Sequence, residues 1–296
     1  MILAVVFALV AALANAVNLM TQHKASIGAP GRVKGWRLAL YLPRQPLWLL
    51  GVAAAVGSFI FQALALHNGP MSVVQPLLIT ELVFTLVLRR IWIRQDIAGG
   101  AWASVSVVCV SLAVFLAVSE PTGGHPAPAA KQWLSAGLVF GGAIAVLVLL
   151  GMRGSPVRRA AVLAAATGLT AAMEATFLKT ATQTLSASGI GGMLTDWPVY
   201  AFIAATITGA LLQQAALHVG PLSVSQPLLV IVDPFASIIL SVWLFGEHFT
   251  DSPAKIAIAV VAFAAMAVGV VMLTRTAPHD LTPSQPARPA SPEPAP

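Results

Sequence analysis

Three acidic residues lie inside long apolar stretches of this sequence: Glu81, Glu174 and Asp233. A charged side chain at the centre of a membrane helix costs roughly 2.5–3.5 kcal/mol on insertion scales, so such a residue usually serves binding or coupling. A carboxylate there can carry a proton or bind a cation. The structural alternative is a protonated carboxyl that only bonds a neighbouring helix. We therefore take the three acids as candidate solute-binding or coupling residues.

Two of these acids are preceded by the same short motif. Glutamine precedes proline at Gln75-Pro76 and at Gln226-Pro227, and Pro234 follows Asp233 directly. A proline inside a helix frees the carbonyl four residues earlier, and in hydrocarbon that carbonyl must line a cavity or bond a neighbour. The alternative is that these prolines only kink their helices and have no role in binding. Further polar candidates for the same site are Gln62, Gln213, Asn15 and Asn18. Asn15, Asn18 and Gln22 share one helix face. The alternative to a binding role for these residues is hydrogen bonding to a neighbouring helix.

Two more charged residues are expected at helix ends. Lys179 lies late in an apolar segment, and we expect its side chain to snorkel to the membrane surface. Glu247 begins a loop, where solvation at the helix end is the simplest account. Neither residue is assigned to the site.

The composition is that of a membrane protein, with 58% hydrophobic and 9% charged residues. The basic residues are scattered between apolar runs, which argues against nucleic-acid binding. Cys109 is the single cysteine, and no nucleophile elbow, phosphate loop, HExxH or CxxC motif occurs. We therefore expect neither an enzyme nor a cofactor.

Nine apolar segments are long enough to span a bilayer. They lie near residues 2–20, 47–66, 71–89, 97–118, 133–151, 159–180, 198–218, 222–245 and 254–274. A helix rises about 1.5 Å per residue, so Glu81 lies about 16 Å beyond Pro70 and Asp233 about 18 Å beyond Pro221. At these distances from the ends of their segments, both acids are expected at the middle of the bilayer. Cleavage after Ala14-Asn15-Ala16 would make the first segment a signal peptide, but that segment lacks basic residues at its start.

The lysines and arginines between these segments are distributed unevenly. Thirteen fall on one side: Lys24, Arg32, Lys34, Arg37, Arg44, Arg89, Arg90, Arg94, Arg153, Arg158, Arg159, Arg275 and Arg288. The other side has Lys131 and Lys255. The positive-inside rule then predicts a plasma-membrane protein with its N-terminus outside and its C-terminus in the cytoplasm.

The sequence contains an internal duplication. Residues 62–78 recur as residues 213–229 with 12 of 17 positions identical, at an offset of 151. At this offset the first four helices correspond to the last four, and the fifth helix has no counterpart. Because an odd helix separates the two copies, the second copy enters the membrane from the opposite side. We predict an all-α membrane protein with nine helices in an inverted repeat. Its parts are residues 1–118, 119–158 with the spacer helix, 159–275, and a disordered proline-rich cytoplasmic tail at 276–296.

In its helix layout and short motifs, the chain resembles the drug/metabolite transporter superfamily, also called EamA-like. The stretch Pro234 to Leu273, with LFGEHFT at 244–250, is similar to the end of that superfamily's repeat. The nine-helix layout, the basic first loop and the SVxQPL pairs at 72–77 and 223–228 look most like its magnesium-transporter branch, associated with the name NIPA. Two features depart from that branch: no acid occurs between Leu47 and Leu66, and Glu81 is extra.

Three functions follow as hypotheses. The first is secondary transport of a small solute by alternating access, coupled through protonation of Glu81, Glu174 or Asp233. The second is transport of magnesium, for which the resemblance and the acids allow Glu81 and Asp233 as ligands. The third is a membrane scaffold whose tail recruits a partner. The expected partners are lipid and the solute or cation, with homodimerisation left open.

Overall fold

The computed structural model describes residues 1–27, 45–93, 97–121, 124 and 128–276. The predicted proline-rich tail and most of the basic first loop lie outside the described residues. Within the described part, nine helical spans are long and apolar enough to cross a membrane, and each corresponds to a predicted span. The prediction of an all-helical membrane protein is thus confirmed at this level.

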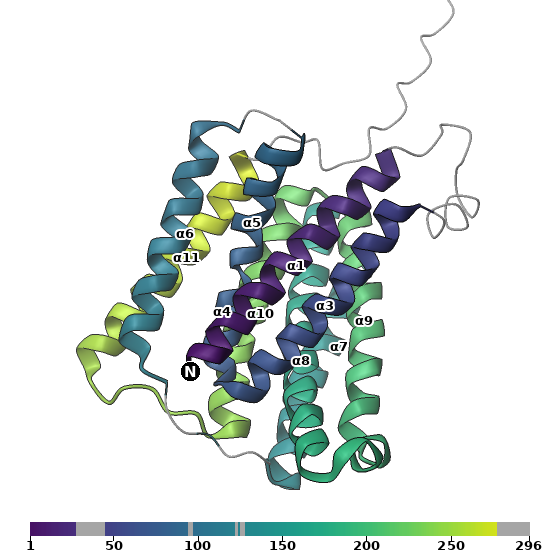
Figure 1. Cartoon of the computed structure of the whole chain (residues 1–296), viewed down its shortest axis with the longest axis vertical. Coiled ribbons are helices and arrows are strands. Elements are labelled where there is room, and N and C mark those ends of the chain that lie inside the picture. Colours follow the sequence, from purple (N-terminus) through teal and green to yellow (C-terminus); the bar gives the residue numbers. More distant parts are fainter. Residues whose placement is uncertain (28–44, 94–96, 122–123, 125–127, 277–296) are drawn as a thin grey trace, which may run out of the picture.

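The helices form one bundle (Figure 1). In chain order they are α1 (Ile2–Ile27), α3 (Pro46–Asn68), α4 (Met71–Leu78), α5 (Thr80–Leu88), the π-helical turn η2 (Arg89–Ile93), α6 (Gly99–Ser119), α7 (Ala130–Gly151), α8 (Pro156–Thr195), α9 (Trp197–Val219), α10 (Leu222–Phe245) and α11 (Pro253–Thr276). The most extensive packing is of α1 on α3, α8 on both α9 and α10, and α6 on α11. The helix α8 is therefore the central support of the second half.

Small residues allow these helices to approach closely, as expected where lipid is as apolar as the side chains. A side chain on Gly69 would collide with Ala4, and one on Gly220 would lie 2.6 Å from Ala160 Cβ. Gly69 and Gly220 occupy equivalent places in the two sequence repeats. The two copies thus use the same kind of contact, a glycine after one helix against an alanine of another.

The third predicted span is interrupted, which the sequence indicated only through Pro76. The helix α4 ends at Leu78 and α5 begins at Thr80, and the amide of Ile79 donates to the Pro76 carbonyl at 3.2 Å. The Thr80 hydroxyl donates to the Leu77 carbonyl at 2.6 Å, which satisfies an acceptor at the break. The equivalent span, α10, is one continuous helix although it contains both Pro227 and Pro234.

The helix α8 is longer than the predicted span of 159–180. It continues to Thr195 and has a non-helical residue at Gly189, with φ of 70°. Ser155 caps its start by accepting from the Arg158 amide, and Asp196 begins α9 by accepting from the Trp197 amide. The extra turns carry small and hydroxyl-bearing residues, which lowered the apolar signal, and at Gly189 the helix kinks before a second helical segment continues to Thr195.

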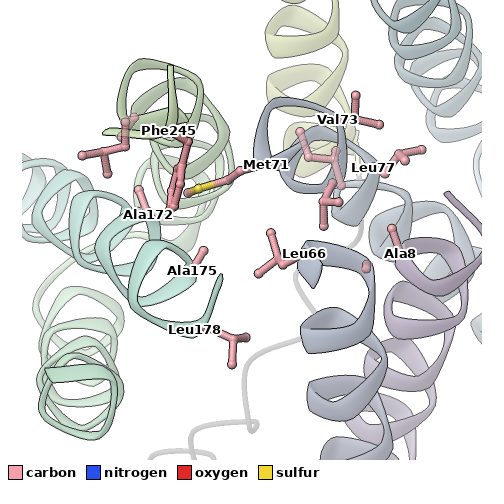
Figure 2. Close-up of a cluster of buried hydrophobic side chains, with 14 of the residues drawn as sticks. Ala8, Leu66, Met71, Val73, Leu77, Ala172, Ala175, Leu178 and Phe245 are labelled. Carbon is pink, nitrogen blue, oxygen red and sulfur yellow. The ribbon is translucent and has the colours of Figure 1, made fainter. Parts of the chain in front are cut away.

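The main apolar core lies where α3, α4, α8 and α10 meet. Figure 2 shows Leu66, Met71 and Phe245 in this cluster with Ala172 and Ala175 of α8. Leu66, Met71 and Phe245 are completely buried. This core joins the start of α4 to the end of α10, two segments from different halves of the chain.

Candidate functional site

Glu81 of α5 accepts the last hydrogen bond of a chain that runs along α1. Asn15 Nδ2 donates to Glu81 Oε2 at 2.7 Å, Asn18 Nδ2 to Asn15 Oδ1 at 3.2 Å, and Gln22 Nε2 to Asn18 Oδ1 at 2.6 Å. Every amide in this chain donates in the direction of the carboxylate. Such an aligned series polarises itself and favours negative charge at its end. The predicted shared face of Asn15, Asn18 and Gln22 is therefore present, and it is directed at Glu81.

Glu81 lies close to the break in the third span, in the first turn of α5 and two residues after Ile79. Its side chain remains partly exposed. The position thus combines a hydrogen-bonded carboxyl with access for a proton or solute.

Glu174 and Asp233 form a second acidic region, carried by α8 and α10. The Thr206 hydroxyl of α9 donates to Glu174 Oε1 at 2.8 Å, and the Ser237 hydroxyl donates to Asp233 Oδ1 at 3.1 Å. The helices that carry the two carboxyls, α8 and α10, pack against each other. Gly168 permits this arrangement, because a side chain there would lie 2.8 Å from Val232 Cβ and 3.1 Å from the Asp233 amide nitrogen.

The four candidate glutamines differ in their surroundings. Gln75 is only 2% exposed, and its side-chain nitrogen has no hydrogen-bond partner among the described residues. Gln62 and Gln226 are partly exposed, and Gln213 is exposed. The structure therefore does not gather the glutamines as a set. Pro76, Pro227 and Pro234 are all buried within the bundle.

The structure contains a charged cluster that the sequence analysis missed. Lys179 Nζ lies 2.7 Å from Glu247 Oε1, and both side chains are buried. Lys179 also lies over the Phe245 ring, 4.5 Å from its centroid. The predictions that Lys179 snorkels and that Glu247 is solvated are both wrong. Each charge can be buried because it is paired with the other, across 68 residues of the chain.

Glu247 also caps the start of α4. Its carboxylate accepts from the Met71 amide at 2.7 Å, the Ser72 amide at 3.0 Å and the Ser72 hydroxyl at 2.6 Å. Burial alone would raise the pKa of Glu247, but the Lys179 ammonium and the hydrogen bonds from Lys179 and Ser72 lower it below its usual value. We call Gly69, Met71, Ser72, Lys179 and Glu247 the end cluster.

Neither acidic region is a preformed metal cage. Among the described residues, no group of three or more histidine, cysteine, aspartate or glutamate side chains could hold a metal ion. Asp233 lies on α10, which packs against the helix α8 that carries Glu174, whereas the sequence analysis paired Asp233 with Glu81 for magnesium. The pair Glu174 and Asp233 therefore becomes the better candidate for a site with two carboxylates.

Comparison with known proteins gives one similarity over the whole chain. An uncharacterized protein of Corynebacterium glutamicum is 29% identical over 279 residues, which cover 93% of this chain and 96% of that relative. Its description names no activity. No family model and no solved structure matches the chain.

Proposed function

We propose that the protein is a secondary transporter of a small solute, working by alternating access between two inverted halves. The observation that supports this most directly is the placement of Glu81, Glu174 and Asp233 within membrane spans, each bonded to a neutral polar side chain. Buried carboxylates that served structure alone would be expected to pair with lysine or arginine, as Glu247 does. These three instead remain partly exposed.

An inverted repeat is supported by the positions of the two Gly-Pro turns along α8. Gly220 lies against Pro156 and Ala160 near the start of α8, whereas the Gly69 carbonyl lies 3.5 Å from Lys179 Nζ. Ala160 and Lys179 are 19 residues apart in this helix, a rise of about 28 Å. That distance is close to the thickness of the bilayer core, about 30 Å. Equivalent turns at opposite membrane surfaces are what inversion requires.

The organisation proposed here is that of the drug/metabolite transporter superfamily, in the plasma membrane, with the C-terminus in the cytoplasm. The asymmetry of lysine and arginine supports this orientation. Protonation of one or more of the three acids would couple movement of the solute to a proton gradient. Homodimerisation stays a prediction.

Magnesium transport is the second candidate. It is favoured by one observation, the placement of Glu174 and Asp233 on the neighbouring helices α8 and α10. Magnesium keeps several of its waters and binds through one or two carboxylates, so a full protein cage is unnecessary. The ion would be the cargo, held between α8 and α10.

The two candidates are separated by growth and uptake measurements on a strain that lacks the gene. The strain is grown on a panel of metabolites and across a magnesium titration, with the wild-type gene or its Asp233→Asn variant restored. A defect in one organic solute that only the wild-type gene repairs supports the first candidate. A defect confined to low magnesium supports the second. Equal rescue by wild type and by a variant lacking residues 277–296 argues against the scaffold hypothesis.

A further inference from the structure

We propose that the end cluster is a gate, and that the described structure is the state in which this gate, at the Gly69 end, is closed. This inference rests on the proposed transport function and specifies how access to its site is controlled. The gate joins α4 of the first half to α8 and α10 of the second half.

The first line of support is the closure itself. Glu247 receives four hydrogen bonds or ionic contacts of 3.0 Å or less, from Met71, Ser72 and Lys179. Glu247 is 1% exposed and Ser72 is completely buried. Because Glu247 is 175 residues from Ser72, this contact ties distant segments together at one end of the bundle.

The second line of support comes from the sequence repeat, which provides an internal comparison. The segments Gly69-Pro70-Met71-Ser72-Val73 and Gly220-Pro221-Leu222-Ser223-Val224 differ in one residue. Ser72 is completely buried, but Ser223 is exposed. Val73 is buried, but Val224 is partly exposed. Among the described residues, these nearly identical segments thus have different surroundings, because the Glu247 carboxylate and Lys179 cover the first of them.

The chemistry of the cluster makes it a switch with two distinct states. Lys179 and Glu247 compensate each other while buried, but separating them within the bundle would leave two unpaired charges. The pair can open only if water reaches both side chains together. Intermediate positions are therefore disfavoured, and the gate is either closed and dry or open and hydrated.

Cysteine labelling tests this gate without any transported solute. Cys109 is exposed, so the background carries Cys109→Ser. Single cysteines are then introduced as Val73→Cys and Val224→Cys, the same residue type in the two repeats. A membrane-impermeant maleimide is applied to the purified full-length protein. We expect rapid labelling at position 224 and protection at position 73. Adding Glu247→Gln should accelerate labelling at position 73 by roughly tenfold or more, since removing one charge of a buried pair strongly destabilises it.

Two controls separate gate opening from other effects. Glu120→Gln breaks the exposed pair of Glu120 with Lys255 and should leave position 73 protected. Ala262→Cys reports on a buried position in α11 and should stay protected in the Glu247→Gln background, which excludes general unfolding. Equal labelling at position 73 with and without Glu247→Gln would overturn the gate. Fast labelling at position 73 in the otherwise unaltered background would also overturn it. Absence of flux for every solute offered to the wild-type protein, with these labelling changes present, would instead count against the proposed transport function.

Discussion

Asn15 of α1 donates a hydrogen bond of 2.7 Å to the carboxylate of Glu81 in α5, across the interface between these helices. Two further amides, from Asn18 and Gln22, extend this bond into a chain directed at the acid. In the proposed transporter this chain tunes how readily Glu81 releases its proton, because the amides stabilise its ionised form.

Asn15→Leu should impair transport and lower stability. The change removes the donor to Glu81 and also leaves Asn18 without its acceptor, so we expect a loss of about 1–3 kcal/mol. Thermal unfolding in detergent and uptake into vesicles measure the two effects. Asn68→Ala is the matched control, because Asn68 is exposed and bonds only within its own helix. If Asn15→Leu behaves like Asn68→Ala in both assays, the amide chain has no functional role.

Asp233→Asn should abolish or uncouple transport while the protein still inserts and accumulates. An amide keeps the size and hydrogen bonding of the carboxyl but removes its charge. Ser237→Ala provides the control, since it removes the hydrogen bond to Asp233 and keeps the acid. Flux and membrane abundance are measured together. Wild-type flux in Asp233→Asn would assign this residue to packing.

Glu247→Gln should destabilise the protein strongly, because it leaves Lys179 buried without a counter-charge. The expected loss is about 3 kcal/mol or more, whereas Glu120→Gln at the exposed pair should change stability by less than about 1 kcal/mol. The midpoints of thermal unfolding of both variants are measured at neutral pH and compared. Similar midpoints for the two variants would show that the buried pair contributes no more than the exposed one.

The stability that Glu247 provides should depend on pH in a definite direction. Its pKa is lowered in the folded protein, so its contribution is complete above the unfolded value of about 4.3 and is lost as pH falls through the lower folded value. The difference in thermal stability between wild type and Glu247→Gln should thus be constant near neutral pH and shrink under acid conditions. A difference that grows on acidification would contradict this assignment.

The charge asymmetry predicts where the C-terminus lies. Thirteen basic residues on one side against two on the other place the end of the chain in the cytoplasm. A cytoplasmic reporter fused after Pro296 should be active, and a reporter that works only outside the cell should be silent. The opposite pattern would reverse the orientation.

The nine spans could be predicted because each is a continuous apolar segment of sufficient length. Counting residues from Pro70 and Pro221 also predicted that Glu81 and Asp233 lie near the middle of their spans. Asn15 and Asn18 could be grouped on one face because that relation is local. These predictions depend only on length, hydropathy and helical spacing.

Contacts between distant segments could not be predicted from length, hydropathy and helical spacing. Lys179 and Glu247 are 68 residues apart, and each alone resembles an ordinary residue at a helix end. Thr206 as the partner of Glu174 had no local signal either, because it lies on a different helix. Pro76 indicated a disturbance in its span, but no local pattern indicated that the break would fall at Ile79 or that the Thr80 hydroxyl would bond the Leu77 carbonyl there.

Flux through purified protein in liposomes tests the central claim most directly. A panel of organic solutes and magnesium is offered with and without an imposed pH gradient, using wild type and Asp233→Asn in parallel. The account predicts uptake of an organic solute that follows the pH gradient, responds to uncouplers and is lost in Asp233→Asn. Magnesium flux that persists without a pH gradient and vanishes in both Glu174→Gln and Asp233→Asn would contradict the organic-solute assignment. Absence of flux for every solute would contradict transport itself.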